Sequence, residues 1–187
     1  MLIYDPANLE SDVKLFTRLV DASKVVGGLS KPSKMPGFAF NLPASRCKVG
    51  GKLSHVPDSV CFSCYAGDDV AWQQQGGRMK FVDGKLKGSR YATPFVQAAL
   101  ARRYDNLSNP LWVPAMVRLV RHYGGEFRWF DSGDLQSVAM LRNIYTAASA
   151  TPNVKHWLPT REAAVVKETE EFFGPPPANL VIRASGI

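Results

Sequence analysis

The strongest constraint on the fold is an alternation of strand and helix patterns in the last third of the chain. Three segments rich in aromatic and β-branched residues read as strands, at residues 126–130, 154–158 and 179–184. Two helical patterns separate them. The first is capped by Ser132 or Asp134 and runs to Ala150, and the second runs from Thr160 to Phe173. Parallel strands joined by helices form right-handed crossovers. We therefore expect an α/β fold with a parallel sheet.

The first two thirds of the chain supply further elements. The patterns predict the following: an amphipathic helix over 8–22, a short strand over 37–42, a helix over 64–75, a hairpin over 81–88, and helices over 93–104 and 109–124. A long segment over 27–65 is rich in Gly, Pro, Ser and Lys. We expect one domain over residues 1–187, a partial (half) βα barrel with an N-terminal helix and a long cysteine-bearing loop. The last strand pattern ends at Ala184, which fits a naturally small partial barrel, a truncated form or one half of an oligomer.

The cysteines are concentrated in one short window. Cys47, Cys61 and Cys64 are the only three in the chain, and they fall within 18 residues. An odd number argues against a disulfide framework and for a metal or cluster site. Cys61 and Cys64 have the C-x-x-C spacing at an expected loop-to-helix junction, and the turn at Gly50-Gly51 could return the chain from Cys47 toward them.

Three interpretations of this window remain open. Three thiolates can hold a [4Fe–4S] cluster and leave one iron open to a small-molecule ligand, and we favour this interpretation. Zinc is the second, because His55 lies between the cysteines and Cys3His is a structural zinc set. The third is a group of reduced, buried thiols.

Polar residues also follow the strands of the expected sheet. Ser132, Gly133 and Asp134 come after one strand and Arg161 after the next. Ligands bind at the carboxyl edge of parallel strands, so we predict that these four residues bind the amino and carboxylate groups of a cofactor near the cysteines. The alternative is helix capping by Asp134 and Thr160.

The net charge of +7 is unevenly distributed. No acidic residue occurs from Ala22 to Pro57, whereas six basic residues do: Lys24, Lys31, Lys34, Arg46, Lys48 and Lys52. Such a basic face fits nucleic acid or a host protein, an anionic ligand, or plain solvation. The sequence has no apolar run of membrane-spanning length and no secretion signal, and free thiols fit a reducing cytoplasm.

Several motifs together resemble a known family. They are Lys34-Met-Pro-Gly37, Leu42-Pro-Ala44, Cys47-x-Val-Gly-Gly-Lys-Leu53, Val60-Cys-x-x-Cys-Tyr-Ala66, Phe127-Arg-Trp-Phe-Asp-Ser-Gly-Asp-Leu-Gln-Ser137 and Trp157-Leu-Pro-Thr-Arg-Glu162. The chain is similar through these motifs to the phage gene-product-88 family. The resemblance implies a phage-encoded protein made in the cytoplasm of a bacterial host.

A more distant similarity is to radical S-adenosylmethionine enzymes. These bind a [4Fe–4S] cluster through three cysteines after the first barrel strand, and the open iron chelates S-adenosylmethionine. The similarity implies that Ser132-Gly133-Asp134 contacts that cofactor here. The gap from Cys47 to Cys61 is longer than in those enzymes, and the expected strands are fewer. We therefore expect an iron–sulfur protein, and the sequence supports binding of the cluster better than it supports radical catalysis. A zinc-stabilised module that binds nucleic acid or a host protein is the alternative.

Overall fold

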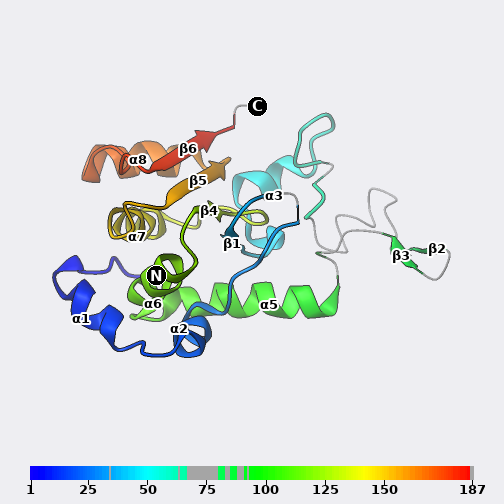
Figure 1. Cartoon of the computed structure of the whole chain (residues 1–187). Helices are drawn as coiled ribbons and strands as arrows, with labels where there is room; N and C mark the ends of the chain where they lie inside the picture. Colours follow the sequence, from blue (N-terminus) through cyan, green and yellow to red (C-terminus); the bar gives the residue numbers. More distant parts are fainter. Residues whose placement is uncertain are drawn as a thin grey trace.

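A parallel four-stranded sheet forms the centre of the molecule (Figure 1). The computed structural model describes residues 1–33, 35–62, 64–66, 91 and 93–185, together with the backbone of 80–82 and 85–87. The strands of this sheet are β1 (Phe38–Phe40), β4 (Glu126–Trp129), β5 (Lys155–Thr160) and β6 (Leu180–Ala184). They pair in parallel in the order β1-β4-β5-β6, so each strand lies beside the next one along the chain. The predicted α/β fold with a parallel sheet is confirmed.

Helices cover one face of this sheet. They are α6 (Trp112–Tyr123), α7 (Val138–Ser149) and α8 (Ala163–Phe173), and each contacts its neighbour in that order. Figure 1 shows the three as one layer beside the strands. Phe127 and Trp129 of β4 are buried, whereas Glu126 is exposed and Arg128, which lies between the two aromatic residues, is half-buried. The period of two therefore separates an apolar, helix-covered face from a more open one.

The N-terminal part differs from its prediction. The single helix expected over 8–22 is two helices, α1 (Leu9–Lys14) and α2 (Leu19–Val26). The chain leaves helical geometry between them and buries Phe16, whose carbonyl accepts a hydrogen bond from Arg118 Nε at 3.0 Å. The prediction was wrong because this break is fixed by a tertiary contact that helical periodicity does not reveal.

The remaining elements are α3 (Val49–Leu53), β2 (Lys80–Val82), β3 (Lys85–Lys87) and α5 (Pro94–Asp105). Of these, the hairpin and the helix that begins at Pro94 match their patterns, whereas α3 lies where the cysteine-bearing loop was expected. Strands β2 and β3 pair antiparallel as the expected hairpin. The helix expected over 64–75 lies outside the described residues from position 67 onward. None of the helices in the described part of the chain has the length and apolarity needed to cross a bilayer.

Aromatic side chains fill the space between the sheet and the helices. Phe40 contacts the rings of both Trp112 and Trp129 edge-on, with centroids 5.3 and 6.3 Å away. His156 is a satisfied core residue, since Trp129 Nε1 donates to its Nδ1 at 3.2 Å and its Nε2 lies 2.8 Å from Thr151 Oγ1. Trp157 does not pack in this core. Strand alternation places it on the open face, half-buried, beneath the guanidinium of Arg128.

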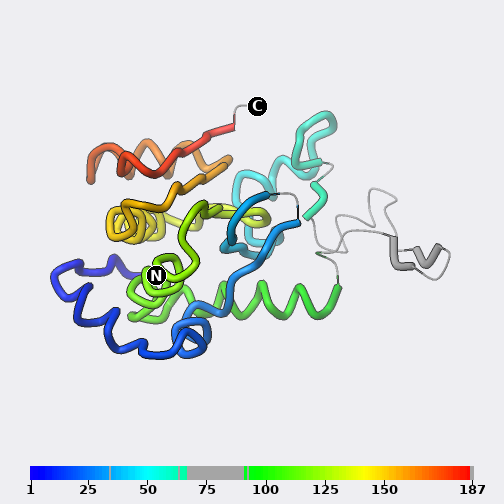
Figure 2. The backbone as a smooth tube through the Cα atoms, in the orientation of Figure 1, coloured from blue at the N-terminus to red at the C-terminus, as the bar shows by residue number. Residues whose placement is uncertain are grey.

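The N-terminus is held against the helical layer. Tyr4 N donates to Asn143 Oδ1 at 2.8 Å, and Asn143 Nδ2 donates to the Leu2 carbonyl at 2.9 Å. The tube in Figure 2 shows the blue N-terminal segment running beside this layer. The first residues of the chain are therefore anchored to α7.

Candidate metal and cofactor site

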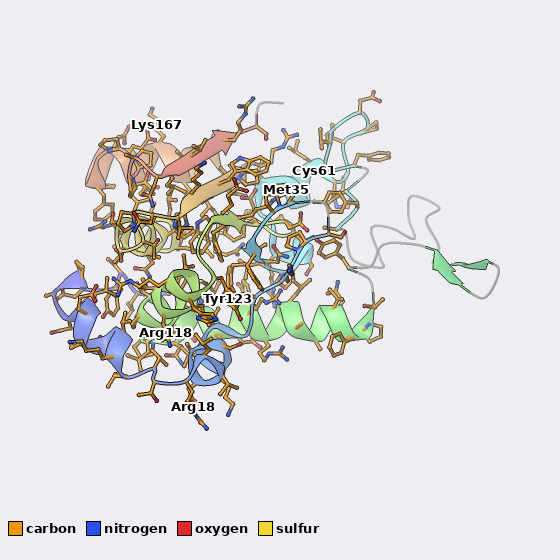
Figure 3. All side chains as sticks on the ribbon, viewed as in Figure 1. Arg18, Met35, Cys61, Arg118, Tyr123 and Lys167 are labelled. Carbon is orange, nitrogen blue, oxygen red and sulfur yellow. The ribbon has the colours of Figure 1, made fainter. Side chains whose placement is uncertain are left out.

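The cysteines lie in a segment that follows the first strand, which we call the thiol loop (residues 47–64). After β1 the chain passes through a short 3-10 turn over Ala44–Arg46 to Cys47, and α3 follows. In Figure 1 this segment lies on the side toward which the β5 and β6 arrowheads point. Figure 3 shows Cys61 well away from Arg18 and Arg118, which lie among the helices on the other side. The thiol loop therefore stands at the carboxyl edge of the sheet, as predicted.

Two of the sulfurs flank a single glycine. A Cβ placed on Gly50 would lie 3.4 Å from Cys61 Sγ and 3.8 Å from Cys47 Sγ. The third thiol, Cys64, interacts electrostatically with both of the others. The described structure thus places the Cys47 and Cys61 sulfurs beside Gly50, with Cys64 close enough to act on both electrostatically.

The surroundings of the thiols disfavour free thiolates. Burial is the main cause that raises the pKa of Cys47 to about 12, and the charges of Asp134, the other thiols and Glu162 add to it. Burial also raises the pKa of Cys61, although the Arg161 guanidinium, which hydrogen-bonds to this thiol, opposes that rise. Without a metal these two thiols are protonated at neutral pH. A coordinated cation would deprotonate them.

The thiols are not arranged around a single ion. Among the residues that the structure describes, no group of three or more His, Cys, Asp and Glu side chains is placed to hold one metal ion. His55, the expected fourth ligand of a zinc site, is exposed. The charged side chains that act on the thiols are instead Asp134, Glu162 and Arg161.

Asp134 joins the ends of two strands. Its buried carboxylate accepts hydrogen bonds from Thr160 Oγ1 at 2.5 Å, Arg161 N at 2.8 Å and Leu135 N at 2.8 Å. Burial raises the pKa of Asp134, and all three of these hydrogen bonds oppose that rise. Helix α7 is capped by Ser137, which accepts from Met140 N at 3.2 Å. The alternative that Asp134 and Thr160 cap helices was wrong, because the two side chains bind each other.

Ser132 and Gly133 bind the same loop to the end of β1. Ser132 Oγ donates to the Leu42 carbonyl at 2.9 Å, and Leu42 N donates to the Ser132 carbonyl at 3.0 Å. Gly133 has a φ of +75°, and a Cβ there would approach the Leu42 carbonyl oxygen to 2.6 Å. Only glycine fits such a left-handed, close-packed position. The Ser132-Gly133-Asp134 motif therefore connects β1, β4 and β5 at their carboxyl ends.

Glu162 belongs to the site although it is absent from the predicted set. Its buried Oε1 accepts a hydrogen bond from Val49 N at 2.8 Å, and its charge acts on the Cys47 thiol. Lys48 Nζ makes a second connection to the sheet edge, at 2.7 Å from the Gln136 carbonyl. The sequence could have indicated Glu162 only through its position next to Arg161, directly after a strand. A single acidic residue at the start of a loop is too common to identify a site residue.

The basic residues make contacts within the protein. The Arg46 guanidinium lies 4.7 Å from the centre of the Tyr104 ring, and Lys31 Nζ lies 5.8 Å from that of Phe38. Lys34 is outside the described residues. A role of these residues toward nucleic acid or a host protein stays a prediction.

Comparison with known proteins gives one match. Residues 13–187 match the model of a protein family described as Gene product 88. No curated protein and no solved structure matches the chain. The match confirms the family resemblance drawn from the sequence motifs, whereas the similarity to radical S-adenosylmethionine enzymes stays a prediction.

Proposed function

We propose that this chain, which belongs to the Gene product 88 family, binds a [4Fe–4S] cluster through Cys47, Cys61 and Cys64. The observation that carries the proposal is that the Cys47 and Cys61 sulfurs flank Gly50 at the carboxyl edge of the sheet, with Cys64 in electrostatic contact with both. Three thiolate ligands leave one iron open to a small molecule. When bound, such a cluster supplies one-electron chemistry and this open coordination position.

The residues fit a cluster better than one zinc ion. A zinc ion requires each sulfur at about 2.3 Å from the same centre. Thiolates that bind different irons of a cluster stand farther apart, and no three described ligands are placed around a single ion. Gly50 places no Cβ beside the Cys47 and Cys61 sulfurs, where one would lie 3.8 and 3.4 Å from them. Exposure of His55 also weakens the Cys3His alternative.

Neighbouring residues take supporting roles. Arg161 hydrogen-bonds to the Cys61 sulfur, and hydrogen bonds to ligand sulfurs adjust the reduction potential of a cluster. Glu162 holds the backbone next to Cys47 through Val49 N. Through its bond to Arg161 N, Asp134 positions the strand end from which Arg161 projects. These contacts connect the thiol loop to the rigid sheet edge.

A radical-SAM-like partial barrel is the finer form of this proposal. The strand order follows the chain order, as in successive strands of a βα barrel, and the thiols follow the first strand. Ser132 and Asp134 are already hydrogen-bonded within the protein. We therefore assign direct contact with S-adenosylmethionine to the open iron and Arg161, and a positioning role to Ser132, Gly133 and Asp134. A phage protein with this site would act in the cytoplasm of the infected bacterium.

The test is anaerobic purification followed by iron, sulfide and zinc analysis. The expected protein is brown, absorbs broadly at roughly 400 nm, and gives a cluster signal in electron paramagnetic resonance after reduction. Cys47→Ser, Cys61→Ser and Cys64→Ser should each lose iron. His55→Ala is the matched control within the same loop, and it should keep its iron. Colourless protein that holds stoichiometric zinc, and that loses this zinc in His55→Ala, would establish the zinc-stabilised module instead.

S-Adenosylmethionine binding is tested separately on fully clustered protein by calorimetry. We expect binding that weakens in Arg161→Gln, while the iron content of this variant stays close to that of the unmodified protein. A clustered protein that releases no heat with S-adenosylmethionine would contradict the radical-SAM-like form and leave cluster binding intact.

A further inference from the structure

We propose that a cavity lined by helix α5, whose described lining meets the thiol loop only through Tyr65 next to Cys64, binds a small organic anion that carries a planar ring. This α5 cavity has a volume of about 830 Å³ and lies between helix α5 and the ends of β1 and β4. The lining residues that carry the inference are Asn41, Tyr65, Tyr91, Phe95, Arg103 and Asp131. The volume is within the range of sites for small molecules and cofactors. The inference stands without the cluster.

Arg103 is a buried cation without an acidic partner in the described part of the chain. Arg103 is only 6% exposed, and its Nε donates a hydrogen bond to the Gly28 carbonyl at 2.9 Å. The ion pairs of the described residues do not include it. Burial, with the neighbouring Arg102 as a smaller cause, lowers the pKa of Arg103 to about 10, so the guanidinium is still charged at neutral pH. An isolated buried charge is costly unless a ligand pairs with it.

Asn41 offers a second donor in the same cavity. It is 2% exposed, and its Oδ1 accepts from Asp131 N at 2.7 Å, which fixes the amide so that Nδ2 points elsewhere. Within the described residues no hydrogen bond engages this Nδ2. The fully enclosed side-chain atoms without a partner there are Trp112 Nε1 and Tyr145 Oη. The nitrogens of Asn41 and Arg103 that make no hydrogen bond are not among these enclosed atoms. Both residues line the cavity, so these nitrogens can reach a ligand there.

The acceptor in this cavity is already engaged. The Asp131 carboxylate pairs with Arg128 at 3.2 Å and accepts a short hydrogen bond from the Tyr91 hydroxyl. The Tyr65 hydroxyl donates to the Asp131 carbonyl at 2.7 Å. Among the described lining residues, the cavity therefore presents the Arg103 guanidinium, Lys31 and an amide donor but no free carboxylate, and it selects an anion rich in acceptors. Arginine forms paired hydrogen bonds with carboxylate and phosphate groups.

Aromatic side chains form the other wall. The rings of Tyr65 and Tyr91 lie 5.8 Å apart at 57°, and both are anchored through Asp131. Phe95 on α5 is 85% exposed at the same cavity. Rings of this kind favour a flat apolar partner in offset or edge contact. The chemical class is thus an aromatic or heteroaromatic phosphate or carboxylate of about mononucleotide size.

The test is calorimetric titration of the full chain with two anionic probes and two neutral ones. The probes are adenosine 5′-monophosphate against adenosine, and indole-3-acetate against indole. We expect at least one anion to bind, and its neutral counterpart to bind at least tenfold more weakly because the Arg103 contact is lost. Binding of the first anion identifies the class as phosphates, and binding of the second identifies it as carboxylates.

Variants on one helix locate the bound anion. Arg103→Gln should weaken binding of the anion at least tenfold. Arg102→Gln removes the same charge from a neighbouring residue outside the cavity lining, and it should change the affinity less than threefold. Phe95→Ala should weaken anion binding severalfold, and it should leave the core intact because Phe95 is exposed. This variant keeps the inference testable if Arg103→Gln fails to fold. Iron is measured in the same samples, so anion binding by iron-free protein would support the α5 cavity while contradicting the cluster. Failure of both anions to bind the folded chain, or equal losses in the two arginine variants, would overturn the inference.

Discussion

The thiol loop and the ends of strands β4 and β5 meet at one site but are held in different ways. The strand ends are fixed by buried hydrogen bonds around Asp134 and by the close contact of Gly133 with Leu42. The thiol loop is joined to them by individual hydrogen bonds, from Lys48 Nζ to the Gln136 carbonyl and from Val49 N to Glu162. The sheet edge is therefore a preformed scaffold. Under the proposed function, a bound cluster would complete the geometry of the thiols.

Gly133→Ala should produce the largest loss of stability. Alanine at a φ of +75°, with its Cβ at 2.6 Å from the Leu42 carbonyl, combines backbone strain with overpacking. We expect a loss of about 3–5 kcal/mol in the free energy of unfolding, measured by urea denaturation. Gly51→Ala is the matched control, because nothing lies within 4 Å of its Cβ position. A Gly133→Ala variant as stable as the control would show that the strand ends are not preformed.

Asp134→Ala comes next. Its removal leaves Thr160 Oγ1 and two backbone N–H groups without an acceptor in a buried place. We expect a loss of about 3 kcal/mol, and a smaller one for Asp134→Asn, which keeps one acceptor oxygen. Both variants should retain the fold of the sheet by circular dichroism. An unchanged unfolding midpoint in Asp134→Ala would contradict the role given to this carboxylate.

Acid should weaken the sheet through His156. Burial lowers its pKa from 6.5 to about 4, so the unfolded state binds the proton first as the pH falls. The stabilising effect of the neutral ring is complete above pH 6.5 and is lost progressively toward pH 4, by up to about 3 kcal/mol. Denaturation followed by tryptophan fluorescence reports this change, since Trp129 stacks on the imidazole.

The exposed His122 provides the control for that pH profile. His122→Gln should keep the fall in stability, and His156→Gln should flatten it. Equal profiles in the two variants would assign the acid sensitivity to other groups.

The smallest effects on stability are expected inside the thiol loop. Gly51→Ala in helix α3 should stabilise the protein by about 0.5–1 kcal/mol, because alanine favours helix and meets open space. Gly50→Ala should change the unfolding free energy by a similarly small amount but lower the iron content, since its Cβ would occupy the space beside the Cys47 and Cys61 sulfurs. Iron analysis with urea denaturation separates the two readouts. Full iron loading in Gly50→Ala would show that this space is not used.

Sequence patterns predict the parts of this protein that depend on local order. The strands at β4, β5 and β6 carry their alternation within a few residues, and the parallel sheet follows from the helices between them. The break between α1 and α2 depends instead on Arg118, far away in the chain. Periodicity within a single helix contains no information about such a contact.

The candidate site is predictable to the same limited extent. Clustering of the cysteines and the polar residues after two strands indicate one edge of the sheet. The partnership of Asp134 with Thr160 is not visible, since each residue alone also suits a helix cap. Arg103 resembles an ordinary surface cation of a helix, because its burial arises from packing against Gly27 and Gly28.

The pairing of β1 with β4 sets an order of events during synthesis. Strand β1 pairs with β4 over Phe38 to Phe127 and Phe40 to Trp129, and the cysteines lie between these two strands in the chain. They leave the ribosome before the strand that completes their edge of the sheet exists. The nascent chain therefore exposes its three thiols for the time needed to synthesise β4, and under the proposed function the capture of a cluster would compete with thiol oxidation during that interval.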